Sequence, residues 1–286
     1  VAVTGDGTND APALNAAQVG LSMGDGTAVA KEASDITIMD NSFGSISKAV
    51  MWGRSLYQNI QRFILFQLTV NLVACIIVVI GAFTGTESPL TVTQMLWVNL
   101  IMDTFAALAL ASLPPSEEVM KNKPRRQNDF IITRKMYAGI IVTGLIFTAL
   151  LYGILQYFRE SPIDSLANFD FMKFLQCYTV VPGGESLTAY DLTMFFTGFG
   201  FLQFWNLFNA RAFESGHTAF HDARHSLVFF ATLAVILIGQ IAIVYVGGAM
   251  FNVCAISPRD MLIIVGATSP VMILPAVCSL AKRLRL

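Results

Sequence analysis

The chain has 286 residues, of which 55% are hydrophobic and only 13% are charged. Soluble domains carry roughly 25% charged residues, so much of this surface is expected to face something other than water. The formal net charge of −1 argues against a nucleic-acid partner.

Residues 1–62 mix charged residues with glycine and alanine, as a soluble segment does, whereas long stretches after Arg62 carry no charge. A β-prone run at residues 1–4 is followed by the loop Gly5-Asp6-Gly7-Thr8-Asn9-Asp10 and by an alanine-rich run at residues 11–17. This order predicts a strand, a loop and a helix. Because open α/β sheets bind ligands at the carboxyl ends of their strands, the loop is a candidate ligand site.

Two aspartates and one asparagine give this loop its chemistry. Asp6 and Asp10 offer hard oxygen ligands that suit Mg²⁺. Asn9, together with Gly5 and the free backbone N–H groups at the helix start, can face a phosphate. We therefore predict Asp6, Asn9 and Asp10 as catalytic residues. The alternative is a plain Asp-Gly turn followed by a capped helix.

From residue 43 an apolar stripe at helical spacing leads into a long apolar run. Since no proline interrupts this pattern before Pro89, we predict one helix over residues 43–83, about 60 Å long at a rise of 1.5 Å per residue. Residues 43–62 would form a stalk, and residues 63–83 would form the first membrane span. The alternative is a separate surface helix that bends at Gly53.

Six apolar runs are each close to the roughly 20 residues that cross a bilayer as a helix. They are residues 63–83, 92–113, 136–158, 192–208, 227–250 and 261–281. The fourth run depends on Asp191 and Asn209 lying at the membrane interfaces. A soluble helical bundle is the alternative, but six runs that carry a single charged residue well inside them leave too little polar surface to coat one. The predicted fold is therefore mainly α, with a six-helix transmembrane bundle.

Lysine and arginine are concentrated in the connections after the second and fourth runs and at the end of the chain, whereas the opposite loops are acidic. The positive-inside rule then predicts an integral multi-pass membrane protein with both termini in the cytoplasm. Cys177 and Cys254 would lie in outer loops, where they could pair in an oxidising compartment or stay free. The sequence has no zinc-ligand spacing.

Asp103 is the only charged residue well inside any of the six runs. An acid at bilayer depth costs about 2.5–3.5 kcal/mol on insertion scales, so it indicates a functional site. Asn99 lies four residues earlier, on the same helical face. Because oxygen ligands favour hard ions such as Ca²⁺, Mg²⁺ or Na⁺, we predict Asn99 and Asp103 as cation ligands. Asn71 and Gln203, on neighbouring runs, either contribute to this site or form interhelical hydrogen bonds.

The string Thr4–Leu14 resembles the hinge motif of P-type ATPases, which lies in their haloacid-dehalogenase-like phosphorylation domain. The resemblance continues through residues 19–35 and 40–43. Residues 98–104 (Val-Asn-Leu-Ile-Met-Asp-Thr) and the string Phe208-Asn209-Ala210-Arg211 are similar to plasma-membrane-type calcium ATPases. The resemblance implies three parts: residues 1–42 as the C-terminal piece of the α/β phosphorylation domain, residues 43–62 as a stalk helix, and residues 63–286 as the transmembrane domain.

This resemblance implies an ATP-driven pump that exports Ca²⁺ across the plasma (inner) membrane, with Mg²⁺ as its cofactor. The family's phosphorylated sequence, Asp-Lys-Thr-Gly-Thr, does not occur in the chain. We therefore expect ATP to be bound mainly by an N-terminal part of the same pump, and the isolated chain to be inactive. Ala74 and Gln203 stand where the related reticulum-type pumps carry glutamates, which implies one Ca²⁺ per ATP. Protonation of Asp103 on the return step would give proton counter-transport.

Membrane lipid and the N-terminal part of the pump are the expected partners. The sequence ends at Leu286 without a basic amphipathic segment that could serve as a calmodulin target, which implies a compact, constitutively active pump of bacterial type. Two alternatives stay open. One is a Na⁺-, K⁺- or H⁺-pumping relative, and the other is a non-catalytic six-span carrier or assembly subunit.

Overall fold

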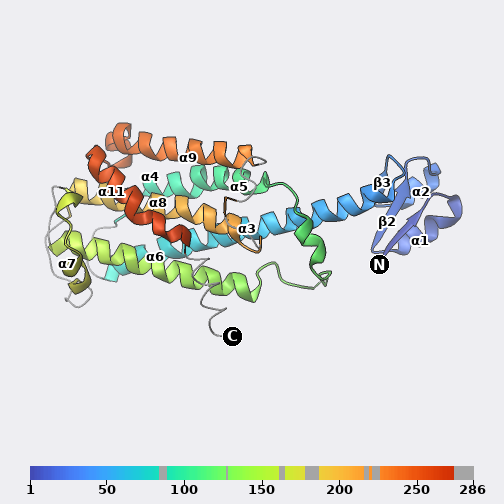
Figure 1. Ribbon diagram of the computed structural model, residues 1–286, viewed down its shortest axis with the longest axis horizontal. Coiled ribbons are helices and arrows are strands. Elements are labelled where there is room, and N and C mark those ends of the chain that lie inside the picture. The colour runs from blue at the N-terminus through green and yellow to red at the C-terminus, as the bar shows by residue number, and fades with distance from the viewer. Residues whose placement is uncertain are drawn as a thin grey trace. The chain divides into compact units, whose positions relative to one another are not determined.

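The structure is a computed structural model that describes residues 1–83, 89–126, 128–160, 165–177, 187–215, 219–220 and 226–273. The described chain is mainly helical, with one small parallel sheet. It divides into two compact units. The first unit comprises residues 1–57 and 115–124, and the second unit comprises the rest. Figure 1 shows the sheet in the blue N-terminal part and the long helices of the second unit.

The first unit contains a three-stranded parallel sheet in the order β1-β2-β3, with one α-helix in each connection and a 3-10 helix before the first of them. Its elements are β1 (Ala2–Gly5), η1 (Thr8–Asp10), α1 (Ala11–Ala16), β2 (Val19–Met23), α2 (Ala28–Ala33) and β3 (Ile36–Ile38). The core is formed by apolar side chains from the sheet and from its helices, among them Leu21 on β2, Leu14 on α1 and Ala30 on α2. Gly20 allows the close approach of β2 to α1, because a Cβ there would lie 2.6 Å from the carbonyl oxygen of Leu14. The predicted strand, loop and helix at residues 1–17 are confirmed.

Helix α3 runs without a break over Phe43–Phe83, as the sequence predicted. Asp40 lies just before it and accepts hydrogen bonds from the Ser45 hydroxyl at 2.6 Å and the Ser42 backbone N–H at 3.2 Å. These bonds, that of Ser45 first, lower the pKa of Asp40 below its ordinary value. Gly53 lies within this unbroken helix, and a Cβ at this position would meet nothing within 4 Å. The alternative of a separate surface helix before the first span is therefore wrong.

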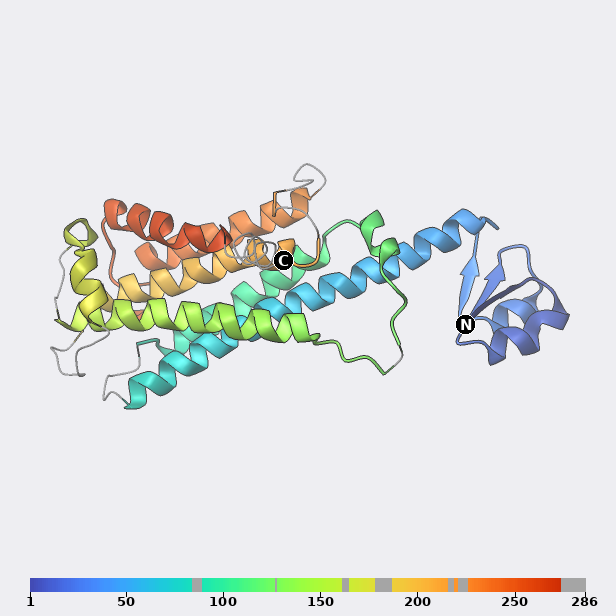
Figure 2. The same ribbon diagram turned by 60° about the horizontal axis from the view of Figure 1, so that its bottom comes forward.

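The second unit is built from helices. They are α4 (Val92–Leu96), the π-helix η2 (Trp97–Met102), α5 (Asp103–Ala111), α6 (Arg134–Glu160), η4 (Leu166–Asn168), α7 (Phe171–Gln176), α8 (Ala189–Ala212), α9 (Leu227–Val246), α10 (Gly248–Phe251), α11 (Pro258–Thr268) and η6 (Ser269–Ile273). The first unit also holds η3 (Glu117–Lys121). Helix α8 packs against α6, α9 and α11 and lies among them in Figure 2. It is buried along most of its length.

Four helical segments within the described ranges are long and apolar enough to cross a membrane: Phe43–Phe83, Val92–Ala111, Arg134–Glu160 and Leu227–Val246. They correspond to the first, second, third and fifth predicted runs. Helix α8, the fourth run, has 24 residues but is not among them. Buried amide and hydroxyl side chains make it more polar, which suits a helix that other helices surround.

Three of the predicted apolar runs differ from the helices in the structure. The second run is not one α-helix, because a π-helical segment interrupts it at Trp97–Met102. The fifth run ends at Val246 and not at residue 250, since Gly248 adopts a φ of +46° that breaks the helix. In the sixth run α11 ends at Thr268, two residues before Pro270, whose ring cannot donate a backbone hydrogen bond. Residues 274–281 of that run lie outside the described residues.

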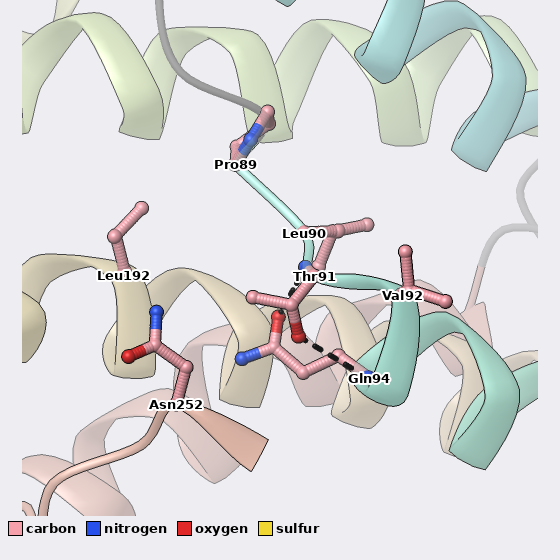
Figure 3. A pocket seen from close by; sticks show the side chains of 7 residues that line it. All are labelled: Pro89, Leu90, Thr91, Val92, Gln94, Leu192 and Asn252. Atoms are coloured by element: carbon pink, nitrogen blue, oxygen red, sulfur yellow. Dashed lines mark hydrogen bonds between the residues drawn. The ribbon is translucent and has the colours of Figure 1, made fainter. Parts of the chain in front are cut away.

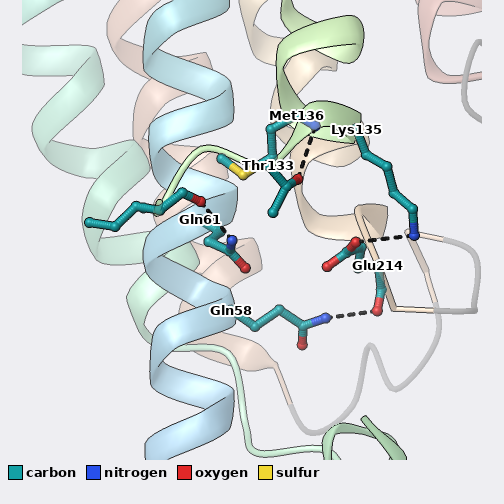
Figure 4. Close-up of polar contacts among 7 residues, drawn as sticks. Gln58, Gln61, Thr133, Lys135, Met136 and Glu214 are labelled. Carbon is teal, nitrogen blue, oxygen red and sulfur yellow. Dashed lines mark hydrogen bonds and ion pairs between the residues drawn. The ribbon is translucent and has the colours of Figure 1, made fainter. Parts of the chain in front are cut away.

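Side chains on one stretch of α3 bond to the chain at the ends of other helices in the second unit. Figure 4 shows the Gln58 amide donating to the carbonyl oxygen of Glu214 at 2.7 Å and the Gln61 amide donating to that of Ile131 at 2.8 Å. An ion pair of 3.6 Å joins Lys135 to Glu214. The start of α6 and the turn after α8 are thereby both attached to α3.

Asn59 and Arg62 extend this set of contacts. The Asn59 amide donates to the carbonyl oxygen of Leu113 at 3.1 Å, just after α5. The Arg62 guanidinium donates to the carbonyl oxygen of Phe213 and to the Asn59 side chain, each at 3.1 Å. All four polar side chains, Gln58 to Arg62, are buried. Gln58, Asn59 and Arg62 donate to carbonyl groups that directly follow α5 or α8, and Gln61 donates to one that precedes α6, so these side chains hold three neighbouring segments against α3.

Cys177 and Cys254 are both free thiols, so the possible disulfide between them is wrong. The Cys177 thiol donates to the Glu160 carboxylate at 3.2 Å. Burial, followed by this hydrogen bond, raises the pKa of Cys177 to about 11, so the group stays protonated at neutral pH. Cys254 lies beside the Thr193 hydroxyl, 3.6 Å away.

Candidate ion-binding site

Asp103 is the first residue of α5 and is only 4% exposed. Both of its carboxylate oxygens are buried and have no hydrogen-bond partner in the described part of the chain. An ionised carboxylate without a partner is costly to bury, by several kcal/mol after relaxation. The position therefore requires either a bound cation or a proton on the acid.

The π-helix immediately before Asp103 carries Asn99. The Oδ1 atom of Asn99 is likewise buried and lacks a partner among the described residues. Isolated π-helical turns occur frequently at functional sites, because the wider turn re-aims side chains and leaves backbone groups less regularly bonded. Asn99 and Asp103 thus supply three unsatisfied oxygens from one short segment.

The other predicted ligands differ in how well they fit this site. Gln203 is fully buried on α8, and neither its amide oxygen nor its amide nitrogen has a partner in the described residues. Asn206, one turn along α8, is also buried with an unsatisfied amide nitrogen. Asn71 on α3 is only half-buried. Within the described chain, no hydrogen bond links Asn71 or Gln203 to Asp103, so their part in the site stays a prediction.

The oxygen atoms of Asn99 and Asp103 favour a hard cation, and further ligands are needed to complete its coordination shell. No group of three or more His, Cys, Asp or Glu side chains within the described ranges could hold a metal. Asn99 and Asp103 offer oxygen only, which suits Ca²⁺, Mg²⁺ or Na⁺. Since Ca²⁺ takes six to eight oxygen ligands, these two side chains can form only part of its coordination shell.

The two aspartates of the loop after β1, Asp6 and Asp10, have different surroundings. One oxygen of Asp10 accepts hydrogen bonds from the backbone N–H groups of Asp6 at 3.1 Å and Gly7 at 2.9 Å, which shapes the loop. Asp6 lies exposed at the carboxyl end of β1, and no hydrogen bond in the described chain engages its carboxylate. Asn9 is exposed as well. The Asp6 oxygens therefore fit a magnesium ion, whereas Asp10 has one oxygen already committed to the backbone.

A pocket of about 290 Å³ lies at the start of α4, on the same helical segment as Asn99 and Asp103. Figure 3 shows the residues that line it: Pro89, Leu90, Thr91, Val92, Gln94, Leu192 and Asn252. Thr91 and Gln94 form a reciprocal helix cap, and the Gln94 amide donates to the carbonyl oxygen of Phe251 at 2.9 Å. The polar groups of Gln94 and Thr91 are thus engaged by the backbone around them.

The sequence predictions omitted Gln240, which is buried on α9 and bonded to Trp97 at the start of the π-helix. A signal for it was present, since Gln240 is a lone amide in the middle of an otherwise apolar run. Its partner could not be read from the sequence, because Trp97 lies 143 residues away.

Comparisons with known proteins identify the family to which the chain is similar. The family model described as "Cation transporting ATPase, C-terminus" matches residues 87–283. The chain is 41% identical to plasma membrane calcium-transporting ATPase 4 of Homo sapiens over 90% of the chain and 20% of that protein. It is 45% identical to plasma membrane calcium-transporting ATPase 2 of Oreochromis mossambicus over 88% of the chain and 22% of that protein. It is 41% identical to calcium-transporting ATPase 2 of Schizosaccharomyces pombe over 88% of the chain and 18% of that protein. The chain thus spans about a fifth of the length of these relatives.

Proposed function

The chain belongs to the cation-transporting ATPases, and from that premise we propose that it forms the C-terminal membrane part of a pump that uses ATP to export Ca²⁺. The observation that carries this proposal is Asp103, a buried carboxylate whose two oxygens lack a partner in the described chain. Three relatives that share 41–45% identity with the chain are named as calcium-transporting ATPases, which favours Ca²⁺ over Na⁺ or K⁺ as the transported ion.

In the proposed site Asp103 supplies the charge and Asn99 a neutral oxygen. Asn71 and Gln203 are proposed to line the site or to orient its ligands. The side chain of Ala74 has no polar atom, and that of Gln203 has no charge. Neither residue can therefore supply the carboxylate that would balance the charge of a second Ca²⁺. We therefore propose that one Ca²⁺ moves per ATP, with further ligands supplied by a part of the pump outside this chain.

The first unit is proposed to be the C-terminal piece of a haloacid-dehalogenase-like phosphorylation domain, with its boundary near residue 42. Its parallel sheet and the acidic loop at the carboxyl end of β1 support this assignment. Asp6 would hold Mg²⁺, with Asp10 beside it. Asn9 and the backbone at Gly5 would face the phosphoryl group. The phosphorylated aspartate and most of the ATP site would belong to the N-terminal part of the pump.

The arrangement in the membrane is also part of the proposal. In addition to the four candidate spans, α8 and the segment that begins with α11 are proposed to cross the bilayer, which gives six spans with boundaries near those predicted. Both termini would then lie in the cytoplasm, in agreement with the positions of lysine and arginine. The plasma membrane of eukaryotes or the inner membrane of bacteria is the proposed location.

The test is Ca²⁺ uptake by the complete pump reconstituted in lipid vesicles, with and without the substitution Asp103→Asn. Removal of the only charged ligand in the chain's part of the site should weaken the apparent Ca²⁺ affinity by about tenfold or more. ATP hydrolysis should be stimulated by Ca²⁺ and not by Na⁺ at the same pH.

The matched control is Asp260→Asn. Asp260 is a fully buried aspartate that accepts hydrogen bonds from Ser165, the Leu166 N–H and Tyr190. This substitution should lower stability and leave the Ca²⁺ concentration for half-maximal uptake unchanged. Equal affinity in wild-type and Asp103→Asn pumps would refute the proposed ion route.

A further inference from the structure

The π-helix that carries Asn99 is attached at its first residue to another helix. The Trp97 indole N–H donates to Oε1 of Gln240 on α9 at 2.8 Å. Both side chains are buried, Trp97 at 8% and Gln240 at 3% exposure. A hydrogen bond between two buried groups is costly to break, because neither group can turn to water instead.

Two glycines shape the space around this pair. A Cβ at Gly239 would lie 2.5 Å from the indole ring of Trp97, so α9 approaches the ring as closely as a glycine allows. A Cβ at Gly200 on α8 would lie 2.8 Å from the Gln240 amide. The indole and the amide are therefore held between the backbones of two helices, and neither can move far without a displacement of α8 or α9.

We propose that Gln240 is a positioning residue for the ion site, an inference that rests on the proposed function. By accepting the indole hydrogen bond, Gln240 fixes the position and rotation of Trp97 at the start of the π-helix. The Asn99 side chain follows two residues later and Asp103 directly after the π-helix ends. The orientation of both ligands is thus coupled to α9, which itself offers no carboxylate to the ion.

A purely structural role for the bond would have a different signature. It would change the amount of folded pump equally at all Ca²⁺ concentrations. A positioning role instead changes the Ca²⁺ concentration at which the pump is half-saturated, because a rotated π-helix presents Asn99 poorly to the ion. The two roles are therefore separated by the apparent Ca²⁺ affinity and the maximal rate per folded pump.

The experiment compares Gln240→Met and Gln240→Glu in the complete pump in vesicles, with Asp103→Asn measured in parallel. Methionine keeps the length of the side chain but removes the acceptor. It should raise the half-saturating Ca²⁺ concentration by about tenfold, the scale of one lost buried hydrogen bond, with the maximal rate unchanged. Glutamic acid, protonated in this apolar setting, keeps an acceptor oxygen and should restore most of the affinity.

The matched control is Thr268→Val, which removes the acceptor of a second, partly buried indole hydrogen bond, from Trp205 at 3.0 Å. It should leave the Ca²⁺ affinity unchanged. If Gln240→Met retains wild-type affinity while Asp103→Asn loses it, the positioning role is wrong and the proposed function stands. If Asp103→Asn has no effect either, the proposed function itself fails. A loss of affinity in Thr268→Val equal to that in Gln240→Met would show a general packing effect and overturn the positioning role.

Discussion

At the scale of single residues, two buried aspartates illustrate how surroundings decide function. Asp260 accepts three hydrogen bonds, including one of 2.6 Å from the Tyr190 hydroxyl, and so joins η4, α8 and α11. Asp103 is nearly as deeply buried, but neither of its oxygens has a partner in the described residues. The first carboxylate is satisfied by the protein itself. The second can be satisfied only by something that the described chain does not provide.

Gly5 is also constrained at this scale, because a Cβ there would lie 2.5 Å from the Cβ of Asp10. We predict that Gly5→Ala displaces the Asp10 carboxylate from the N–H groups of Asp6 and Gly7 and costs about 1–3 kcal/mol of local stability. In the complete pump this should lower the maximal Mg²⁺-dependent ATPase rate and leave the Ca²⁺ concentration for half-activation unchanged.

The control for this prediction is Gly53→Ala, since the space around Gly53 is open. Alanine there should be neutral or stabilise α3 by up to about 1 kcal/mol, as expected for an exposed helix position. A Gly5→Ala pump with a normal maximal rate would show that the loop tolerates the added methyl group, contrary to the proposed role of Asp10.

At the scale of elements, α3 is the continuous link between the two units in the sequence. Its first turn bonds within the first unit, where the Ser45 hydroxyl donates to the Asp40 carboxylate. Its later residues, Gln58 to Arg62, bond within the second unit. A helix that is bonded within both units can transmit movement from one unit to the other only if it stays rigid between these two sets of contacts.

We therefore predict that insertion of two glycines after Gly53 uncouples ATP hydrolysis from transport in the complete pump. Each glycine in a helix interior costs about 1 kcal/mol relative to alanine, so the insertion creates a flexible point. The number of Ca²⁺ ions moved per ATP, measured from uptake and hydrolysis in one vesicle preparation, should fall while hydrolysis continues. An unchanged ratio would argue against α3 as the coupling element.

At the scale of the whole molecule, the site must keep its charge balanced throughout a transport cycle. A single carboxylate without a cationic neighbour in the described chain cannot stay ionised in an apolar site after the ion leaves. The simplest solution is that Asp103 binds a proton while Ca²⁺ is absent and releases it when Ca²⁺ returns.

This reasoning predicts proton counter-transport by the complete pump. During Ca²⁺ uptake into vesicles, a pH-sensitive dye in the lumen should report alkalinisation that depends on ATP and Ca²⁺ and disappears in Asp103→Asn. A proton ionophore should abolish the pH change without stopping uptake. Transport whose rate and charge movement are independent of the pH on the release side would contradict the exchange of Ca²⁺ for protons.

The sequence by itself determined the features that depend on neighbouring residues. The length of an apolar run, the uninterrupted helix at residues 43–83, the loop after β1 and the presence of one acid in a span are all local properties. The helix breaks at Gly248 and before Pro270 also had local signals, although the apolar runs concealed them.

Only the tertiary structure decided which polar groups find partners. Trp97 and Gln240 meet across 143 residues, and Asp260 collects donors from segments 70 to 95 residues away. The π-helix before Asp103 was not predicted from the sequence, and three of its side chains, Trp97, Val98 and Met102, are buried in the core. The physical reason is that hydrophobic burial is encoded along the chain, whereas a buried hydrogen bond depends on two distant groups arriving at one place with matched geometry.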